Sequence, residues 1–144
     1  MNGRVAVVLA LCCISFAPAL AAAGGFDGSQ PFLCTVNDVT ECLAGEKCKE
    51  VSAEDINLPR FLWIDVGKKT IQSKKQGDDA RKSQIDQVKH VDGKLMLQGA
   101  EGGGEDIGGG FGWTIAIMEN TGHMVLTASG DLVGDVAFGV CTTQ

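Results

Sequence analysis

Residues 113–142, which read WTIAIMENTGHMVLTASGDLVGDVAFGVCT, decide the fold of this chain. Apolar residues recur at every second position over residues 113–118, 123–129 and 135–142, and turn-forming residues separate these runs. A period of two is typical of β-strands with one buried face. Because connections this short join only antiparallel neighbours, the segment predicts a three-stranded β-meander.

The same alternation extends upstream of this meander. Residues 84–91 and 94–98 flank Asp92-Gly93, a pair that suits a tight hairpin turn with positive φ at both central positions. Further strand patterns occupy residues 32–42, 47–51, 60–66 and 68–73. We therefore expect antiparallel pairing along most of the chain.

Shorter segments interrupt the strand patterns. Residues 52–58 predict a short helix, because a capping serine begins the segment and Pro59 ends it. Gly67 predicts a bend or bulge after which the strand continues. Residues 74–79 and the glycine-rich residues 99–112 predict loops, the second of them mobile.

These patterns together predict a mainly β fold. About eight strands form an antiparallel meander, which is the number at which a small barrel closes. A two-sheet sandwich is the alternative architecture.

The first 23 residues have the layout of a secretory signal peptide. Arg4 precedes the apolar run 5–16, and small residues suited to cleavage after Ala21 or Ala23 follow it. The apolar run is too short to span a membrane as a helix. We expect residues 1–23 to be removed on export.

Length and charge limit what the mature chain is expected to be. The 144-residue sequence carries a formal net charge of −6. Residues 24–144 suit a single disulfide-stapled β domain, periplasmic or secreted, without a transmembrane segment. An acidic exported chain is a poor match for nucleic acid, so we expect none as a partner.

Four cysteines follow the predicted cleavage site, an even number in a chain bound for an oxidising compartment. Cys42 and Cys48 bracket a short loop, which favours a local disulfide. That pairing leaves Cys34, on the first strand, for Cys141, on the last, so these strands would be neighbours as in a closed barrel. The rival pairings join Cys34 to Cys42 or Cys48.

The sequence has no recognisable catalytic or metal-binding motif. The cysteine spacings are not those of a zinc site, and no Gly-x-Ser-x-Gly nucleophile motif occurs. His90 and His123 both lie on strand patterns near turns, where a surface position is the simplest interpretation. We therefore predict no enzymatic activity, no catalytic residues, no metal and no cofactor.

Aromatic residues are the candidates for ligand binding. Trp63, Phe111, Trp113 and Phe138 lie on strands or at the edge of the glycine-rich segment. Most such residues simply pack in a core. Alternatively, they line a cavity at the mouth of a barrel, where binding sites collect.

Several runs carry a resemblance to known proteins. The runs are residues 58–71, 95–99, 112–115, 121–127 and 138–142. Through them the chain resembles a group of small exported proteins of Gram-negative bacteria, which implies a compact envelope protein without an assigned activity. It is more loosely similar to small periplasmic β-barrel inhibitors of lysozyme, although no run matches their inhibitory motif.

Two functions follow as hypotheses. The first is a non-enzymatic exported β-barrel of the cell envelope that binds a small apolar ligand or a partner protein of the envelope. The alternative is an inhibitor-like protein-interaction module that acts on an envelope enzyme.

Overall fold

The computed structural model describes residues 25–73, 81–102 and 109–143. The predicted signal peptide (1–23) and the predicted loop 74–79 lie outside these residues. The described residues form strands and turns without a helix. The strands are β1 (Phe32–Leu43), β2 (Lys49–Val51), β3 (Phe61–Asp65), β4 (Thr70–Ser73), β5 (Lys82–Gln84), β6 (Gln87–Val91), β7 (Lys94–Glu101), β8 (Phe111–Met118), β9 (His123–Gly130) and β10 (Val133–Thr143).

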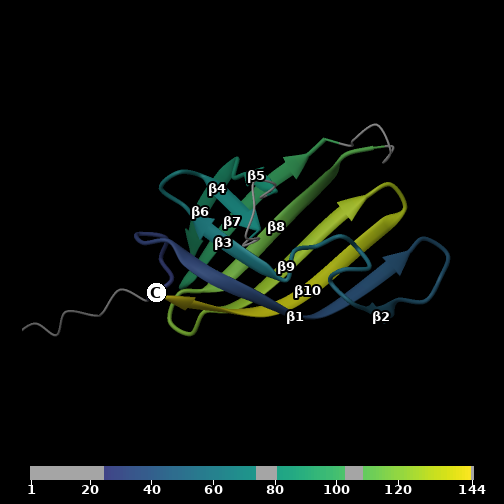
Figure 1. Ribbon diagram of the computed structural model, residues 1–144, viewed down its shortest axis with the longest axis horizontal. Helices are drawn as coiled ribbons and strands as arrows, with labels where there is room; N and C mark the ends of the chain where they lie inside the picture. The colour runs from purple at the N-terminus through teal and green to yellow at the C-terminus, as the bar shows by residue number, and fades with distance from the viewer. Residues whose placement is uncertain (1–24, 74–80, 103–108, 144) are drawn as a thin grey trace, which may run out of the picture.

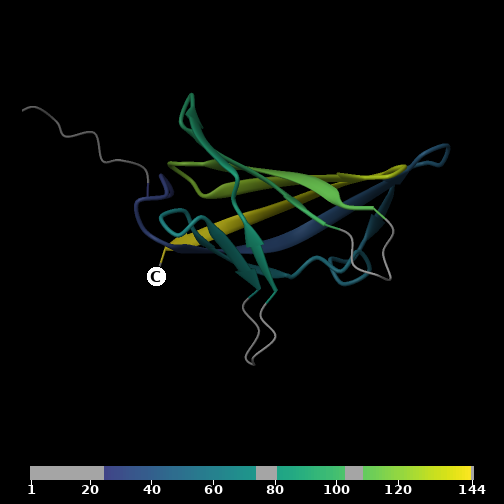
Figure 2. The same cartoon turned by 90° about the horizontal axis from the view of Figure 1, so that it is seen from above.

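The strands form one antiparallel sheet in the order β5-β4-β3-β1-β10-β9-β8-β7-β6, and β2 pairs with β1 beside this path. The sheet curls so that β8 and β9 lie across from β1 and β3 (Figures 1 and 2), which gives a half-barrel. The prediction of a mainly β, antiparallel, barrel-like fold is confirmed. The described residues contain ten strands rather than about eight.

The first and last long strands, β1 and β10, are neighbours joined by a disulfide. Cys34 and Cys141 are partners in the antiparallel register and are bonded across a sequence separation of 107 residues. The second disulfide joins Cys42 to Cys48 across the turn between β1 and β2. The favoured pairing is thereby confirmed, and two disulfides suggest an oxidising, extracytoplasmic compartment.

The single strand expected over residues 84–91 is instead divided between two edges of the sheet. Its first part belongs to β5, which pairs with β4, whereas β6 pairs with β7. Between them, the Ile85 N–H donates to the Lys69 carbonyl (2.9 Å) and the Asp86 N–H donates to the Gln98 carbonyl (2.8 Å). Adjacent amides therefore tie together the two edges of the half-barrel.

Two turns contrast in how well the sequence predicted them. Asp92 and Gly93 have φ values of 48° and 72°, which confirms the predicted tight turn between β6 and β7. The strand continuation expected at Gly67 is wrong, since β3 and β4 form an antiparallel hairpin there. The Asp65 carboxylate accepts a hydrogen bond from the Lys68 N–H (3.0 Å), and this bond holds the reversal.

Two other local predictions are wrong in part. Residues 52–58 form successive turns rather than a helix: the Asp55 N–H donates to the Ser52 carbonyl (3.2 Å) and the Asn57 N–H to the Glu54 carbonyl (3.0 Å), and Asn57 has a φ of 55°. The predicted cap is present, since Ser52 and Asp55 exchange hydrogen bonds. The ends of the predicted loop 99–112 belong to β7 and β8, which pair there; residues 103–108 lie outside the described residues.

The core lies on the inward face of the curled sheet. Alternate residues of the strands point inward, so one face of each strand is buried. The largest fully buried side chains are Phe32, Ile64, Ile85, Leu95, Leu97, Ile115, Ile117 and Met124. Most of them gather at the end of the half-barrel that holds the Cys34–Cys141 disulfide, and we call this the packed end.

Candidate ligand-binding cavity

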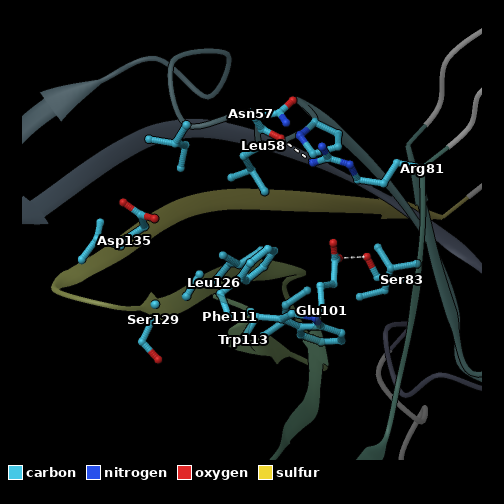
Figure 3. A pocket seen from close by; sticks show the side chains of 18 of the residues that line it. Asn57, Leu58, Arg81, Ser83, Glu101, Phe111, Trp113, Leu126, Ser129 and Asp135 are labelled. Atoms are coloured by element: carbon cyan, nitrogen blue, oxygen red, sulfur yellow. Dashed lines mark hydrogen bonds between the residues drawn. The ribbon is translucent and has the colours of Figure 1, made fainter. Parts of the chain in front are cut away.

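A cavity of about 660 Å³ extends toward the other end of the sheet, where Glu41 pairs with Asp135, and we call this the open end. Figure 3 shows part of the cavity lining from close by. Its apolar wall comes from strands on both sides of the curl, with Leu62, Ile71, Ile115 and Leu126 among the residues that line it. Pockets for small molecules usually measure about 300 to 1,000 Å³ and are mostly apolar. The cavity therefore has the size and the lining of a small-molecule site.

The alternation of β8 and β9 places their side chains in the cavity. Trp113 and Ile115 alternate with outward residues on β8, and Leu126 and Ala128 do so on β9. Because the side-chain period of a strand is two, each pair projects from the same face. The pattern that predicts these strands also builds the cavity wall.

Trp113 is the largest side chain in this wall. Its indole is only 7% exposed. Its cross-strand partner is Gly99, where any Cβ atom would come within 2.3 Å of the indole ring. The glycine thus provides the space in which the ring lies flat against β7. The indole Nε1 is buried and has no hydrogen-bond partner among the described residues.

Polar side chains ring part of the cavity. Arg81 donates from Nη1 to the Asn57 carbonyl (2.7 Å), and Ser83 donates to the Glu101 carboxylate. These groups lie toward one end of the pocket and Asp135 lies at the opposite end (Figure 3). The rim is therefore acidic at more than one point, while Arg81 is already engaged by a backbone oxygen.

Glu41 and Asp135 are cross-strand partners on β1 and β10, and both line the cavity. The register of β1 shifts between Val36 and Asp38. Val36 faces inward before the bulge. The bulge then reverses which positions face inward, so that Val39 and Glu41, three and five residues later, also face inward. Without the extra residue, Glu41 would project from the outer surface.

The two carboxylates have different surroundings. Glu41 forms an ion pair with Lys49 of β2, with 3.0 Å between Oε2 and Nζ. Asp135 has a buried Oδ1 atom without a hydrogen-bond partner among the described residues. Burial, and secondarily the charge of Glu41, raises the pKa of the Asp135 carboxyl above its usual range. Asp135 is thus an inward-facing acid whose charge is poorly compensated.

The structure separates the four aromatic residues predicted for ligand binding. Phe111 and Trp113 both line the cavity. Trp63 alternates with the buried Leu62 and Ile64 and so projects from the other face of β3. Phe138 lies on the outer face of β10 and is 48% exposed. The cavity therefore includes two of the four, and a binding role for any of them stays a prediction.

Sequence reasoning missed the inward acids. Asp135 could have been found from the alternation of β10, because it falls between the inward positions Val133 and Ala137. An acid on an otherwise apolar strand face is uncommon and marks a position of interest. Glu41 offered no comparable signal, because only the bulge turns it inward.

The two histidines of the chain lie away from the cavity. His90 contacts Glu119 through Nδ1 (2.6 Å), and His123 contacts Thr121 (3.0 Å), all outside the cavity. In the described part of the chain, no group of three or more His, Cys, Asp or Glu residues is placed to hold a metal ion. Nor do these residues contain a helix with the length and apolar character that a membrane crossing requires.

Comparison of the chain with protein-family models, curated proteins and solved structures finds no match.

Proposed function

We propose that this protein is a non-enzymatic, exported β-barrel protein of the bacterial cell envelope that binds a small apolar molecule. The observation that carries this proposal is the cavity of about 660 Å³ at the open end, with its apolar wall. A folded chain gains free energy by filling such space with its own side chains. A cavity of this size and lining is the usual site of a ligand.

The apolar residues that line the cavity support ligand binding. Phe111 and Trp113 provide flat aromatic surface, and Leu126 adds an aliphatic wall. Aromatic rings bury a large apolar area against a ligand at a small entropic cost. The site is built on strands, which hold it more rigidly than loops would.

The location of the protein is part of the proposal. Both disulfides join residues within the folded domain. Such bonds persist in the periplasm or outside the cell. The predicted signal peptide and the resemblance to exported proteins of Gram-negative bacteria favour the same compartments.

A matched pair of substitutions on β9 tests ligand binding. Ala128 lines the cavity, whereas its neighbour Thr127 faces solvent. Ala128→Phe should weaken binding of the neutral probe N-phenyl-1-naphthylamine at least about tenfold, because the new ring occupies the space that the probe needs. Thr127→Phe should bind the probe as the wild type does. Probe fluorescence on titration measures both affinities.

Two results would contradict the proposal. Wild-type protein that does not bind the probe would show that the cavity takes no apolar ligand of this size. Equal affinities for Ala128→Phe and wild type would place the probe elsewhere on the molecule. Circular dichroism and the unfolding midpoint establish that both variants are folded.

A further inference from the structure

We propose that the ligand of the cavity is an apolar amine whose protonated nitrogen lies against Asp135. This inference rests on the proposed binding function and specifies the chemistry of the ligand. It follows from the order of side chains across the sheet, from the pairing of the acids and from the charge around the cavity.

A single row of residues runs across the sheet at the open end. Glu41, Asp135, Ala128, Trp113 and Gly99 are successive cross-strand partners on β1, β10, β9, β8 and β7. Side chains opposite one another in antiparallel strands point from the same face. The row therefore changes from acidic to small to aromatic, as a ligand with a charged head and an apolar body requires.

Unlike Asp65 and Glu41, Asp135 has no cation at ion-pair distance among the described residues. Asp65 pairs with Lys68 (2.9 Å), and Glu41 pairs with Lys49 (3.0 Å). Within the described residues, no lysine or arginine lies at ion-pair distance from Asp135, and its Oδ1 atom has no hydrogen-bond partner. A partly buried carboxylate is costly unless it is paired, so a cationic ligand would remove an existing penalty.

The rim of the cavity also favours a cation. Glu41, Glu101, Asp131 and Asp135 line it, against the single described cation Arg81. Arg81 already donates to a backbone carbonyl, and Lys49 neutralises only Glu41. Acidic groups beside low-dielectric apolar walls concentrate a negative potential in the space between them. A carboxylate or phosphate ligand would be repelled there.

An ammonium group matches the chemistry of this position. It has three N–H donors and no acceptor, so it can donate to Asp135 and to the neighbouring Glu41 together. The small side chain of Ala128 leaves room beside Asp135 for the alkyl part of the ligand. The body of the ligand would then lie against Trp113, which is the next residue of the row.

Three probes with the same alkyl chain test this chemistry: decylamine, 1-decanol and decanoate. At neutral pH the first is cationic, the second neutral and the third anionic. Wild-type protein should bind decylamine about ten- to hundredfold more tightly than 1-decanol, the range expected for a charge-assisted hydrogen bond, and decanoate most weakly. Isothermal titration calorimetry measures the three affinities.

Asp135→Asn keeps the shape of the side chain and removes its charge. We expect it to lose about tenfold or more in affinity for decylamine and to bind 1-decanol as the wild type does. Unchanged binding of 1-decanol shows that the variant has a folded cavity. Glu50→Gln is the matched control, because Glu50 is exposed on β2 and does not line the cavity. It should leave all three affinities unchanged.

The amine proposal is overturned if wild-type protein binds 1-decanol or decanoate as tightly as decylamine. It is also overturned if Asp135→Asn retains the preference for decylamine. In each of these cases ligand binding itself stands. Failure of all three probes and of N-phenyl-1-naphthylamine would contradict the proposed function as well, so the two proposals fail in distinguishable ways.

Discussion

The packed end and the open end of the half-barrel use the same strands for different purposes. At the packed end, Phe32, Ile64 and Ile117 are fully buried. Toward the open end, Ile115 lies on β8 as Ile117 does, but it lines a cavity. Close packing gives most of the stability of a fold, whereas a cavity sacrifices some of it. The comparison indicates that stability and binding are assigned to opposite ends of one sheet.

Acidic residues at the two ends also differ in how many hydrogen-bond partners they have. Asp65, near the packed end, is buried and bonded to both the backbone N–H and the ammonium group of Lys68. Asp135, at the open end, has a buried Oδ1 atom with no hydrogen-bond partner in the described part of the chain. Satisfied polar groups are typical of structural positions, while unsatisfied ones collect where a ligand completes the site. The two ends therefore differ in polar satisfaction as well as in packing.

Removal of each disulfide in turn is expected to cause the largest change in the free energy of unfolding. The Cys34→Ala/Cys141→Ala variant opens a loop with a sequence separation of 107 at the packed end. In the chain-entropy model this loss costs about 4 to 5 kcal/mol. The Cys42→Ala/Cys48→Ala variant opens a separation of 6 at the open end and should cost about 2 kcal/mol.

Urea unfolding under non-reducing conditions measures both free energies. Equal losses in the free energy of unfolding for the two variants would show that the Cys34–Cys141 disulfide between β1 and β10 stabilises the fold no more than the local disulfide does. They would remove one of the differences between the two ends.

Replacement of one isoleucine at each end by alanine is expected to cause the next largest loss in the free energy of unfolding. Ile115 and Ile117 lie on the same face of β8, but only Ile115 lines the cavity. Ile117→Ala should lower the free energy of unfolding by about 3 kcal/mol or more, since it opens a void in close-packed surroundings. Ile115→Ala should cost about 1 kcal/mol less, because its side chain already borders empty space.

Urea unfolding curves with a common m-value provide this comparison. A larger loss for Ile115→Ala than for Ile117→Ala would contradict the division into a packed end and an open end. It would mean that the cavity wall is as well packed as the core.

Local signals predicted much of this fold from the sequence. The period-two patterns gave the antiparallel strands, and Asp92-Gly93 gave its turn, because both depend on residues close in the chain. The pairing of Cys34 with Cys141 followed once the short loop between Cys42 and Cys48 favoured a local disulfide. The division of residues 84–91 between two edges depends on hydrogen bonds to distant strands, which no local pattern reports.

The cavity was less predictable than the fold. Trp113 and Phe111 could be named as candidates because aromatic residues often line pockets, and both lie there. Trp63 and Phe138 have the same chemistry but face outward, since the curl of the sheet decides which face encloses space. Glu41 was hidden by the bulge in β1, which reverses the alternation only once the strand is paired.

The pH dependence of stability is expected to show the smallest effect, with opposite signs at the two ends. Hydrogen bonds from the side chain and backbone of Lys68 lower the pKa of Asp65, whereas burial and the charge of Glu41 raise the pKa of Asp135. The unfolded value is about 3.9 for both. Asp65 therefore stabilises the fold above about pH 4, and this stabilisation is lost as the pH falls through its lowered pKa.

Asp135 behaves in the opposite sense. Its folded state binds the proton more tightly, so stability is lost as the pH rises from about 4 through the raised pKa. At about pH 7, Asp65→Asn should be less stable than wild type and Asp135→Asn more stable, each by less than about 1 kcal/mol. Both differences should shrink toward about pH 3, where both carboxyls are largely protonated in the unfolded state. Urea unfolding at the two pH values measures them, and differences of the same sign at neutral pH would contradict the contrast between a satisfied and an unsatisfied acid.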